Sequence, residues 1–214
     1  MTIRVLIADD HKVVADGLRL LLEAHSDIEV VGIARSGREA IRGALDLHPQ
    51  VVVMDSNMPE LNGIEATRAI RERSPETRVL VLSVHSDPVH IVRALRAGAW
   101  GYVPKSSAGS DVVEAIRVVD GGRRYLHPTI SEAVMAQLVG PEADDDPVAR
   151  LSTRERQVLQ LLADGENVAD IGIALSLSPR TVETYRARLM EKLDIRDVPG
   201  LVKFAILHGL TGLE

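Results

Sequence analysis

Four short apolar runs, each followed at once by an acid, a hydroxyl or an amine, most constrain what this chain can fold into. The runs cover residues 3–8, 51–54, 79–82 and 102–104, and the polar residues that follow them are Asp9, Asp10, Asp55, Ser83 and Lys105. Continuous β-branched runs are typical of strands buried on both faces, as in a parallel sheet. Ligands of open α/β sheets bind beyond the carboxyl ends of the strands. We therefore expect the five side chains to converge on one spot, where together they can hold Mg²⁺ and accept a phosphoryl group.

The first 120 residues alternate between strand and helix patterns. One more strand pattern covers residues 29–34, and apolar residues recur at helical spacing in 13–24, 37–47, 64–73, 88–97 and 111–119. Five strands that alternate with five helices predict a doubly wound, five-stranded parallel sheet of the α/β class. We place this first domain at residues 1–122.

The rest of the chain predicts a linker and a second, purely helical domain. Residues 123–149 are expected to be the linker, with a helix from Pro128 to Leu138 before the acidic segment 140–147. Ser152 and Glu155 then fit a capping box, and Ser178 caps a later helix. Four helices with a tight turn at 176–178 predict an all-α helix-turn-helix domain over residues 150–214.

Composition excludes several classes of function. The chain has no cysteine, which rules out disulfides and thiolate metal sites and fits a reducing cytosol. No apolar stretch approaches the ~18 residues that span a bilayer, so we expect a cytoplasmic protein without membrane partners. The net charge is −6, and residues 151–214 hold eight basic and nine acidic residues. Any affinity for DNA must therefore come from a local basic face.

The acidic residues at the strand ends are candidate ligands of Mg²⁺, which prefers carboxylate and carbonyl oxygens. The expected ligands are Asp10, Asp55, the backbone carbonyl of Asn57, and Asp9 either directly or through water. A carboxylate can accept a phosphoryl group, whose oxygens the metal, Lys105 and the Ser83 hydroxyl could each hold. A single Asp at a strand end is usually a helix cap or a solvated loop residue. Five such groups at four strand ends favour a functional site.

Taken together, these motifs resemble a known family. D-D at 9–10, D-S-N-M-P at 55–59, Gly63, Ser83 and G-Y-V-P-K at 101–105 resemble a response-regulator receiver domain, which has a flavodoxin-like fold. L-S-T-R-E-R-Q-V-L at 151–159 and L-S-P-R-T-V-E-T-Y-R-A-R-L at 177–189 resemble the LuxR-type DNA-binding domain. Nearly the whole chain is thus similar to a two-component regulator of the NarL/FixJ type.

The resemblance implies a phosphorylation-switched transcription regulator. It implies Asp55 as the phosphoacceptor, Lys105 as the phosphate partner, and Ser83 and Tyr102 as a switch pair. A sensor histidine kinase would donate the phosphoryl group, and the protein would not be an enzyme beyond its own phosphorylation and dephosphorylation. From spacing alone, Tyr102 is more often a core residue than a switch. His85 and Asn57, each two residues beyond a strand-end group, could flank the phosphoryl group.

The helix expected from Pro179 to about Leu193 is the candidate DNA-reading element. Val182, Tyr185, Leu189 and Leu193 share one face and predict burial, so the opposite face should enter the major groove of double-stranded DNA. The resemblance places base reading on Glu183, Thr184 and Ala187, while phosphate or guanine contacts suit Arg180, Arg186, Arg188 and Lys192. The alternative is a solvated helix with charge pairs such as Glu183 with Arg186. We expect a homodimer on phosphorylation or DNA binding, with two half-sites.

Two rival functions stay open, and Pro104, Val168, Ala169 and Gly172 depart from the family pattern. A regulator that pairs through protein contacts without phosphorylation would not need the intact acidic pocket. A phosphatase with an aspartyl intermediate would need a second acid two residues after Asp55, where Asn57 stands, and would leave the helix-turn-helix idle. Gly172 replaces the alanine that the family typically has, and it should weaken its helix by about 1 kcal/mol relative to Ala.

Overall fold

The structure is a computed structural model that describes residues 2–131, 134, 147–148, 150–208 and 210–211. The chain divides into two compact units, residues 1–138 and 139–214. Among the described residues, none of the helices combines the length and the apolar character that crossing a membrane requires.

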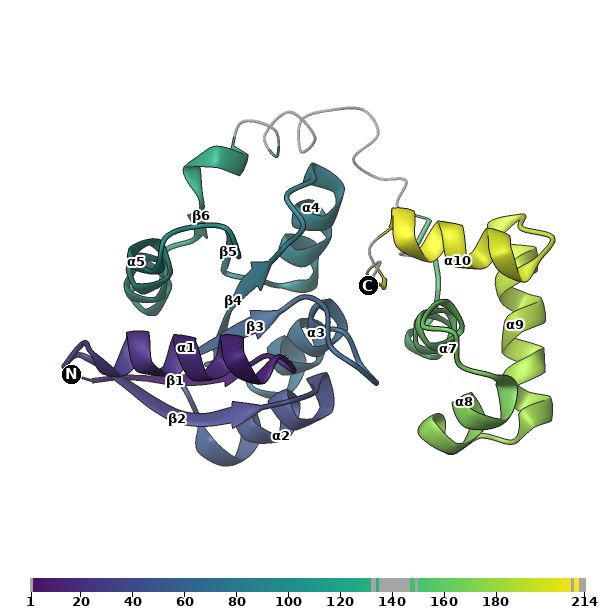
Figure 1. Cartoon of the computed structure of the whole chain (residues 1–214), viewed down its shortest axis with the longest axis horizontal. Helices are drawn as coiled ribbons and strands as arrows, with labels where there is room; N and C mark the ends of the chain where they lie inside the picture. The colour runs from purple at the N-terminus through teal and green to yellow at the C-terminus, as the bar shows by residue number, and fades with distance from the viewer. Residues whose placement is uncertain (1, 132–133, 135–146, 149, 209, 212–214) are drawn as a thin grey trace. The chain divides into compact units, whose positions relative to one another are not determined.

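The first unit is built on a parallel sheet (Figure 1). Within the described residues the strands follow the order β2-β1-β3-β4-β5-β6, and every neighbouring pair is parallel. The strands are β1 (Ile3–Ala8), β2 (Ile28–Ala34), β3 (Val51–Asp55), β4 (Arg78–Ser83), β5 (Gly101–Pro104) and β6 (Tyr125–Leu126). The expected parallel α/β fold is confirmed.

Five helices cover the two faces of this sheet: α1 (Lys12–Glu23), α2 (Gly37–Leu47), α3 (Gly63–Arg73), α4 (Pro88–Ala97) and α5 (Gly109–Asp120). Alternate strand residues enter separate cores, because successive side chains of a strand point to opposite faces. Val5 and Ile7 pack with α1 and α5, whereas Leu6 and Ala8 pack with α2, α3 and α4. Both faces are therefore closed, which leaves the loops at the strand ends as the place for polar groups.

The sheet extends one strand further than the five we expected. The backbone N–H of Tyr125 donates to the carbonyl of Trp100 at 3.0 Å, and that of His127 donates to Tyr102 at 3.2 Å, which adds β6 beside β5. A strand of two residues is too short to show the alternation of apolar and polar side chains by which a strand is predicted. Residues 128–131 and 134 are helical; the rest of the helix expected to Leu138 and most of the acidic segment lie outside the described residues.

The second unit is all-helical, as expected, with α7 (Thr153–Ala163), α8 (Val168–Leu175), α9 (Pro179–Leu193) and α10 (Val198–Leu207). The predicted capping box is present, because the Ser152 hydroxyl accepts from the N–H of Glu155 at 3.3 Å and the Glu155 carboxylate accepts from the N–H of Ser152 at 2.7 Å. Side chains of all four helices, among them Val158, Ile171 and Leu201, share one core.

A tight turn joins α8 to α9. Ser176 ends α8 in the left-handed region with φ 56°, and the N–H of Leu177 donates to the carbonyl of Gly172 at 2.8 Å. A Cβ atom on Gly172 would lie 2.8 Å from the carbonyl oxygen of Leu177. The sequence predicts that Gly172 weakens its helix relative to Ala, but the structure shows that an alanine there would meet the backbone of the turn, because the missing side chain lets the turn close against α8.

Candidate functional site

The polar residues that follow the strands do meet at one edge of the sheet. The strands β1, β3, β4 and β5 are parallel neighbours, with Ala8 opposite Met54 and Ser83 opposite Pro104. Their carboxyl ends consequently point the same way. Ionic contacts across these ends then join residues as far apart in sequence as Asp9 and Lys105.

Lys105 holds two of the acids together. Its Nζ lies 2.8 Å from Oδ2 of Asp9 and 2.7 Å from Oδ2 of Asp55. Asp55 is only 4% exposed, and this burial raises the pKa of its carboxyl to about 6 although Lys105 opposes the shift. Burial works against the Lys105 ammonium in turn, but Asp55 and Asp9 outweigh it and raise the pKa of that amine.

The loop after β3 is shaped for close approach. The N–H of Gly63 donates to the carbonyl of Ser56 at 2.9 Å, and a Cβ on Gly63 would lie 1.8 Å from the carbonyl oxygen of Asp55. The N–H of Asn57 donates to Oδ1 of Asp55 at 3.2 Å. Gly63 therefore allows the chain to pass close to the end of β3. Within the same loop, the backbone N–H of Asn57 points at the Asp55 carboxylate.

Asp10 completes an acidic cluster with Asp9 and Asp55. One carboxylate oxygen each from Asp9, Asp10 and Asp55 and a ring nitrogen of His11 lie within 4.8 Å of one another. Oδ1 of Asp10 is buried without a hydrogen bond, 3.0 Å from Nδ1 of His11. An orphaned carboxylate oxygen beside two further carboxylates is a donor set that fits a hard divalent cation.

Ser83 and Tyr102 lie beside this cluster, and both side chains are buried. The Ser83 hydroxyl shares a hydrogen bond of 2.7 Å with the hydroxyl of Ser56 and accepts from the N–H of His85 at 3.0 Å. Tyr102 is 1% exposed within the core, its hydroxyl donates to the carbonyl of His85 at 2.7 Å, and burial raises its pKa. The burial agrees with the core reading of Tyr102, while its hydroxyl reaches the loop after β4.

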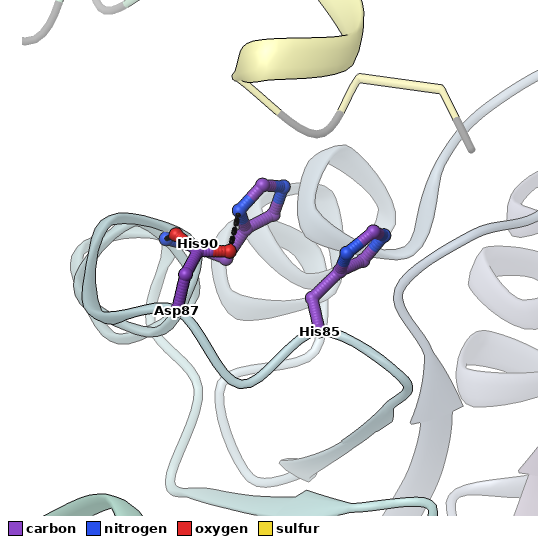
Figure 2. A group of neighbouring side chains, drawn as sticks. All are labelled: His85, Asp87 and His90. Carbon is purple, nitrogen blue, oxygen red and sulfur yellow. Dashed lines mark hydrogen bonds and ion pairs between the residues drawn. The ribbon is translucent and has the colours of Figure 1, made fainter. Parts of the chain in front are cut away.

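That loop carries a second group of titratable side chains, of which the sequence singles out His85 alone. His85 lies 3.4 Å from the side-chain nitrogen of Asn57, and its ring stacks on His90 with centroids 4.5 Å apart. Nδ1 of His90 lies 2.6 Å from Oδ2 of Asp87 (Figure 2). Burial, followed by His90, lowers the pKa of His85. The signal in the sequence was the spacing of residues 85, 87 and 90 across a helix start.

In the second unit, α9 has the two faces that its apolar spacing predicted. Val182 and Leu189 are buried, and Tyr185 and Leu193 pack against the same core. The exposed candidate DNA contacts are Arg180, Glu183, Thr184, Ala187, Arg188 and Lys192, with Arg186 half-buried. A surface hollow at the start of α9 is lined by Ser178, Arg180, Thr181, Thr184, Tyr185 and Arg188.

Several of these side chains already have partners. Arg186 pairs with Glu183 at 2.7 Å, and the Thr184 hydroxyl donates to the carbonyl of Arg180 at 2.9 Å. Nζ of Lys192 lies 2.7 Å from Oε2 of Glu155, whose side chain is 4% exposed. Lys192 thus ties α9 to α7, a role that sequence spacing did not indicate.

A parallel α/β domain with an acidic cluster and a lysine at its strand ends, joined to a four-helix domain with a helix-turn-helix, defines a signal receiver coupled to a DNA-binding module. Residues 5–117 match the response regulator receiver domain, and residues 149–205 match the bacterial regulatory proteins of the luxR family. The chain belongs to the response regulators with a LuxR-type DNA-binding domain. It is a transcription regulator and not a classical enzyme, and its Asp9, Asp10 and Asp55 cluster is typical of a magnesium-binding phosphorylation site.

Similar proteins cover nearly the full length of the chain. The response regulator UvrY of Escherichia coli K12 is 38% identical over 212 residues, which are 99% of this chain and 97% of UvrY. The response regulator GacA of Pseudomonas aeruginosa is 38% identical over 209 residues, which are 98% of each chain. A structure of two RcsB dimers bound to two parallel DNAs is 26% identical with a TM-score of 0.60, and it covers 95% of this chain and 98% of RcsB. A response regulator implies a cognate kinase.

Proposed function

We propose that this response regulator accepts a phosphoryl group on Asp55 from a sensor histidine kinase, and that phosphorylation alters its dimerisation and DNA binding. One observation carries the proposal: Asp55 is buried at the end of β3, 2.7 Å from the Lys105 ammonium and beside Asp9 and Asp10. A buried carboxylate that faces both an ammonium and further carboxylates suits phosphoryl transfer, which mainly needs positioning and neutralised charge.

In the proposed reaction, a carboxylate oxygen of Asp55 attacks the phosphorus of the kinase phosphohistidine. The bond from phosphorus to the imidazole nitrogen breaks, the nitrogen keeps the electron pair, and an acyl phosphate forms on Asp55. Lys105 then exchanges its contact with the carboxylate for a phosphoryl oxygen. Bound Mg²⁺ would supply the remaining positive charge, with Asp10, Asp55 and the Asn57 carbonyl as ligands and Asp9 acting directly or through water.

The proposed readout passes through Ser83 and Tyr102. The Ser83 hydroxyl is covered and can turn from Ser56 to a phosphoryl oxygen with little movement of its backbone. Such a turn removes an acceptor from the N–H of His85, on the loop that also accepts from Tyr102. A local change of charge would thereby alter the start of α4.

The proposed output is binding of the exposed face of α9 to the major groove, as a homodimer on two half-sites. The face carries Arg180, Glu183, Thr184, Arg186, Ala187, Arg188 and Lys192. Arg180 and Arg188 line the hollow at the start of α9 and are the main candidates for phosphate contacts. RcsB, a structural relative, binds DNA as dimers, which supports pairing here. Access to DNA and to a kinase supports a cytoplasmic location.

Phosphoryl labelling tests the central step. The full chain is incubated with Mg²⁺ and a small acyl phosphate, and the mass of the intact protein is measured. Wild type should gain one phosphoryl group, Asp55→Asn should gain none, and Asp46→Asn, on the exposed side of α2, should behave as wild type. Removal of Mg²⁺ with EDTA should stop labelling. Stoichiometric labelling of Asp55→Asn would refute the assignment.

A further inference from the structure

Two histidines and an aspartate meet at the start of α4, outside the acidic cluster (Figure 2). His85 lies in the loop after β4, Asp87 caps α4, and His90 lies in the first turn of that helix. One ligand atom from each of the three residues lies within 4.8 Å of the other two. The two imidazole rings are stacked with their planes 15° apart, so they must tilt out of the stack before their nitrogens can bind one tetrahedral ion, on which two ligands lie about 3.4 Å apart.

His90 is the residue of the three with a buried ring nitrogen that lacks a partner. Its side chain is 5% exposed; Nδ1 pairs with Oδ2 of Asp87 at 2.6 Å, whereas the buried Nε2 makes no hydrogen bond. Buried polar atoms without partners are costly and rare. A capping role explains Asp87, whose Oδ1 accepts from the N–H of His90 at 3.1 Å, but it does not explain why a second imidazole stacks on His90.

The donor set selects the kind of ion. Two imidazole nitrogens and one carboxylate suit Zn²⁺ and similar transition metals, whereas Mg²⁺ prefers oxygen ligands alone. Three protein ligands leave the fourth tetrahedral position for water, as in open zinc sites. The Asp87 side chain is 48% exposed, so the ion can reach the site from solvent and leave it again.

We propose that His85, Asp87 and His90 form an exchangeable Zn²⁺ site, and that the bound ion opposes phosphorylation by holding the loop after β4. The loop is linked to the phosphoacceptor pocket by the backbone of His85, whose N–H donates to Ser83 and whose carbonyl accepts from Tyr102. An ion on the His85 side chain fixes that backbone and with it the position of Ser83. The regulatory half of the proposal rests on the proposed function; the binding site does not.

Metal titration of the full chain tests the site. Zn²⁺ is added in a calorimeter with Mg²⁺ in excess, so that oxygen-only sites are occupied by Mg²⁺. Wild type should bind one Zn²⁺ per chain, and Co²⁺ in its place should give the visible absorption of a four-coordinate nitrogen and oxygen site. His85→Asn and Asp87→Asn should each weaken binding by at least about tenfold, since even the loss of an outer-shell partner has such an effect.

The variants separate binding from folding and from the other cluster. His90→Gln removes the third ligand but alters a buried side chain, whereas His85→Asn changes a half-buried loop residue and Asp87→Asn keeps a good helix cap. His11→Asn is the matched control, because His11 lies in the acidic cluster, and it should bind Zn²⁺ as wild type does. Wild-type affinity in both His85→Asn and Asp87→Asn, or loss of binding in His11→Asn, overturns the site.

The regulatory half is tested with the labelling reaction. Zn²⁺ should slow phosphorylation of the wild type by a small acyl phosphate at least about fivefold, the lower end of ordinary coupling between two sites. Asp87→Asn should react at the same rate with and without Zn²⁺. An unchanged wild-type rate in the presence of bound Zn²⁺ overturns the regulatory half. Failure to label Asp55 without Zn²⁺ counts against the proposed function instead.

Discussion

At Asp55, burial outweighs the attraction of Lys105 and raises the pKa of the carboxyl from 3.8 to about 6. The folded protein therefore holds this proton more tightly than the unfolded chain does. The stabilisation that protonation gives is complete below about pH 4 and is lost as the pH rises through about 6. Asp55→Asn imitates the protonated carboxyl at every pH. We expect this variant to exceed wild type in free energy of unfolding by on the order of 1–3 kcal/mol at pH 8 and to match it near pH 4.

Urea unfolding in EDTA, followed by fluorescence, measures this difference. The chain has one tryptophan, Trp100, which packs against the core beneath α1 and α5 and so reports on the unit that holds Asp55. Asp46→Asn serves as the control for removing an exposed charge. A difference between Asp55→Asn and wild type that stays the same from pH 4 to pH 8 would contradict the raised pKa.

At the scale of the elements, replacing glycine by alanine should have opposite effects on stability in α8 and in α1. Gly172→Ala would place a Cβ 2.8 Å from the backbone oxygen of Leu177, so we expect it to destabilise the second unit by roughly 1–3 kcal/mol, as overpacking does. A Cβ on Gly17 in α1 would meet no atom within 4 Å, and Gly17→Ala should stabilise the first unit by up to about 1 kcal/mol. Thermal melts followed by far-ultraviolet circular dichroism decide both signs; a higher melting temperature for Gly172→Ala would refute the close packing of the turn.

If α9 is the recognition helix, as proposed, two of its cations should differ in their roles. Arg188 lines the hollow at the start of α9, so Arg188→Ala should weaken binding to every duplex and lower the slope of log affinity against log salt by about one. Lys192 is engaged by the buried Glu155, so Lys192→Ala should mainly reduce the stability of the second unit. Affinity against salt for an operator and for random duplex measures the slope. Equal slopes for wild type and Arg188→Ala would remove Arg188 from the phosphate contacts.

Element boundaries were predictable where the signal is local. The ranges of α2 and α4 match the expectation residue for residue. For α4 the signals are local, because Asp87 caps the helix before Pro88 and Gly98 ends it. The sequence does not predict strand β6, since its two residues show no alternation of apolar and polar side chains. They form a strand only by pairing with β5. The packing role of Gly172 has no local signal either, because the atom that excludes a side chain there belongs to the following turn.

At the scale of the whole molecule, the proposed function predicts coupling between phosphorylation and DNA affinity. Phosphorylated wild type should bind its operator about 5–150 times more tightly than the unmodified protein, the usual range for two coupled sites. Its dimer fraction in light scattering should rise in parallel. Asp55→Asn treated with the same phosphodonor should change in neither measurement. Full labelling without any change in affinity or dimer fraction would favour the rival regulator that pairs independently of phosphorylation.

The candidate site was predictable to the extent that it depends on strand order. Placing Asp10, Asp55 and Lys105 together needs only parallel neighbouring strands, which apolar runs indicate. The ion pair of Lys192 with Glu155 and the stacking of His85 on His90 join separate helices or turns. Such contacts depend on the angle at which elements pack, which no short motif encodes.

Tyr102 contacts residue 85 through a main-chain carbonyl and not through the imidazole. Every amino acid supplies that oxygen, so a substitution at position 85 leaves the bond to the tyrosine in place. That bond therefore places no demand on the side chain at position 85, which contacts Asn57 and His90 instead. If Asp55 is the phosphoacceptor, as proposed, evolution can change the side chain at position 85, and with it the lifetime of the acyl phosphate, without losing the hydrogen bond that joins this loop to Tyr102.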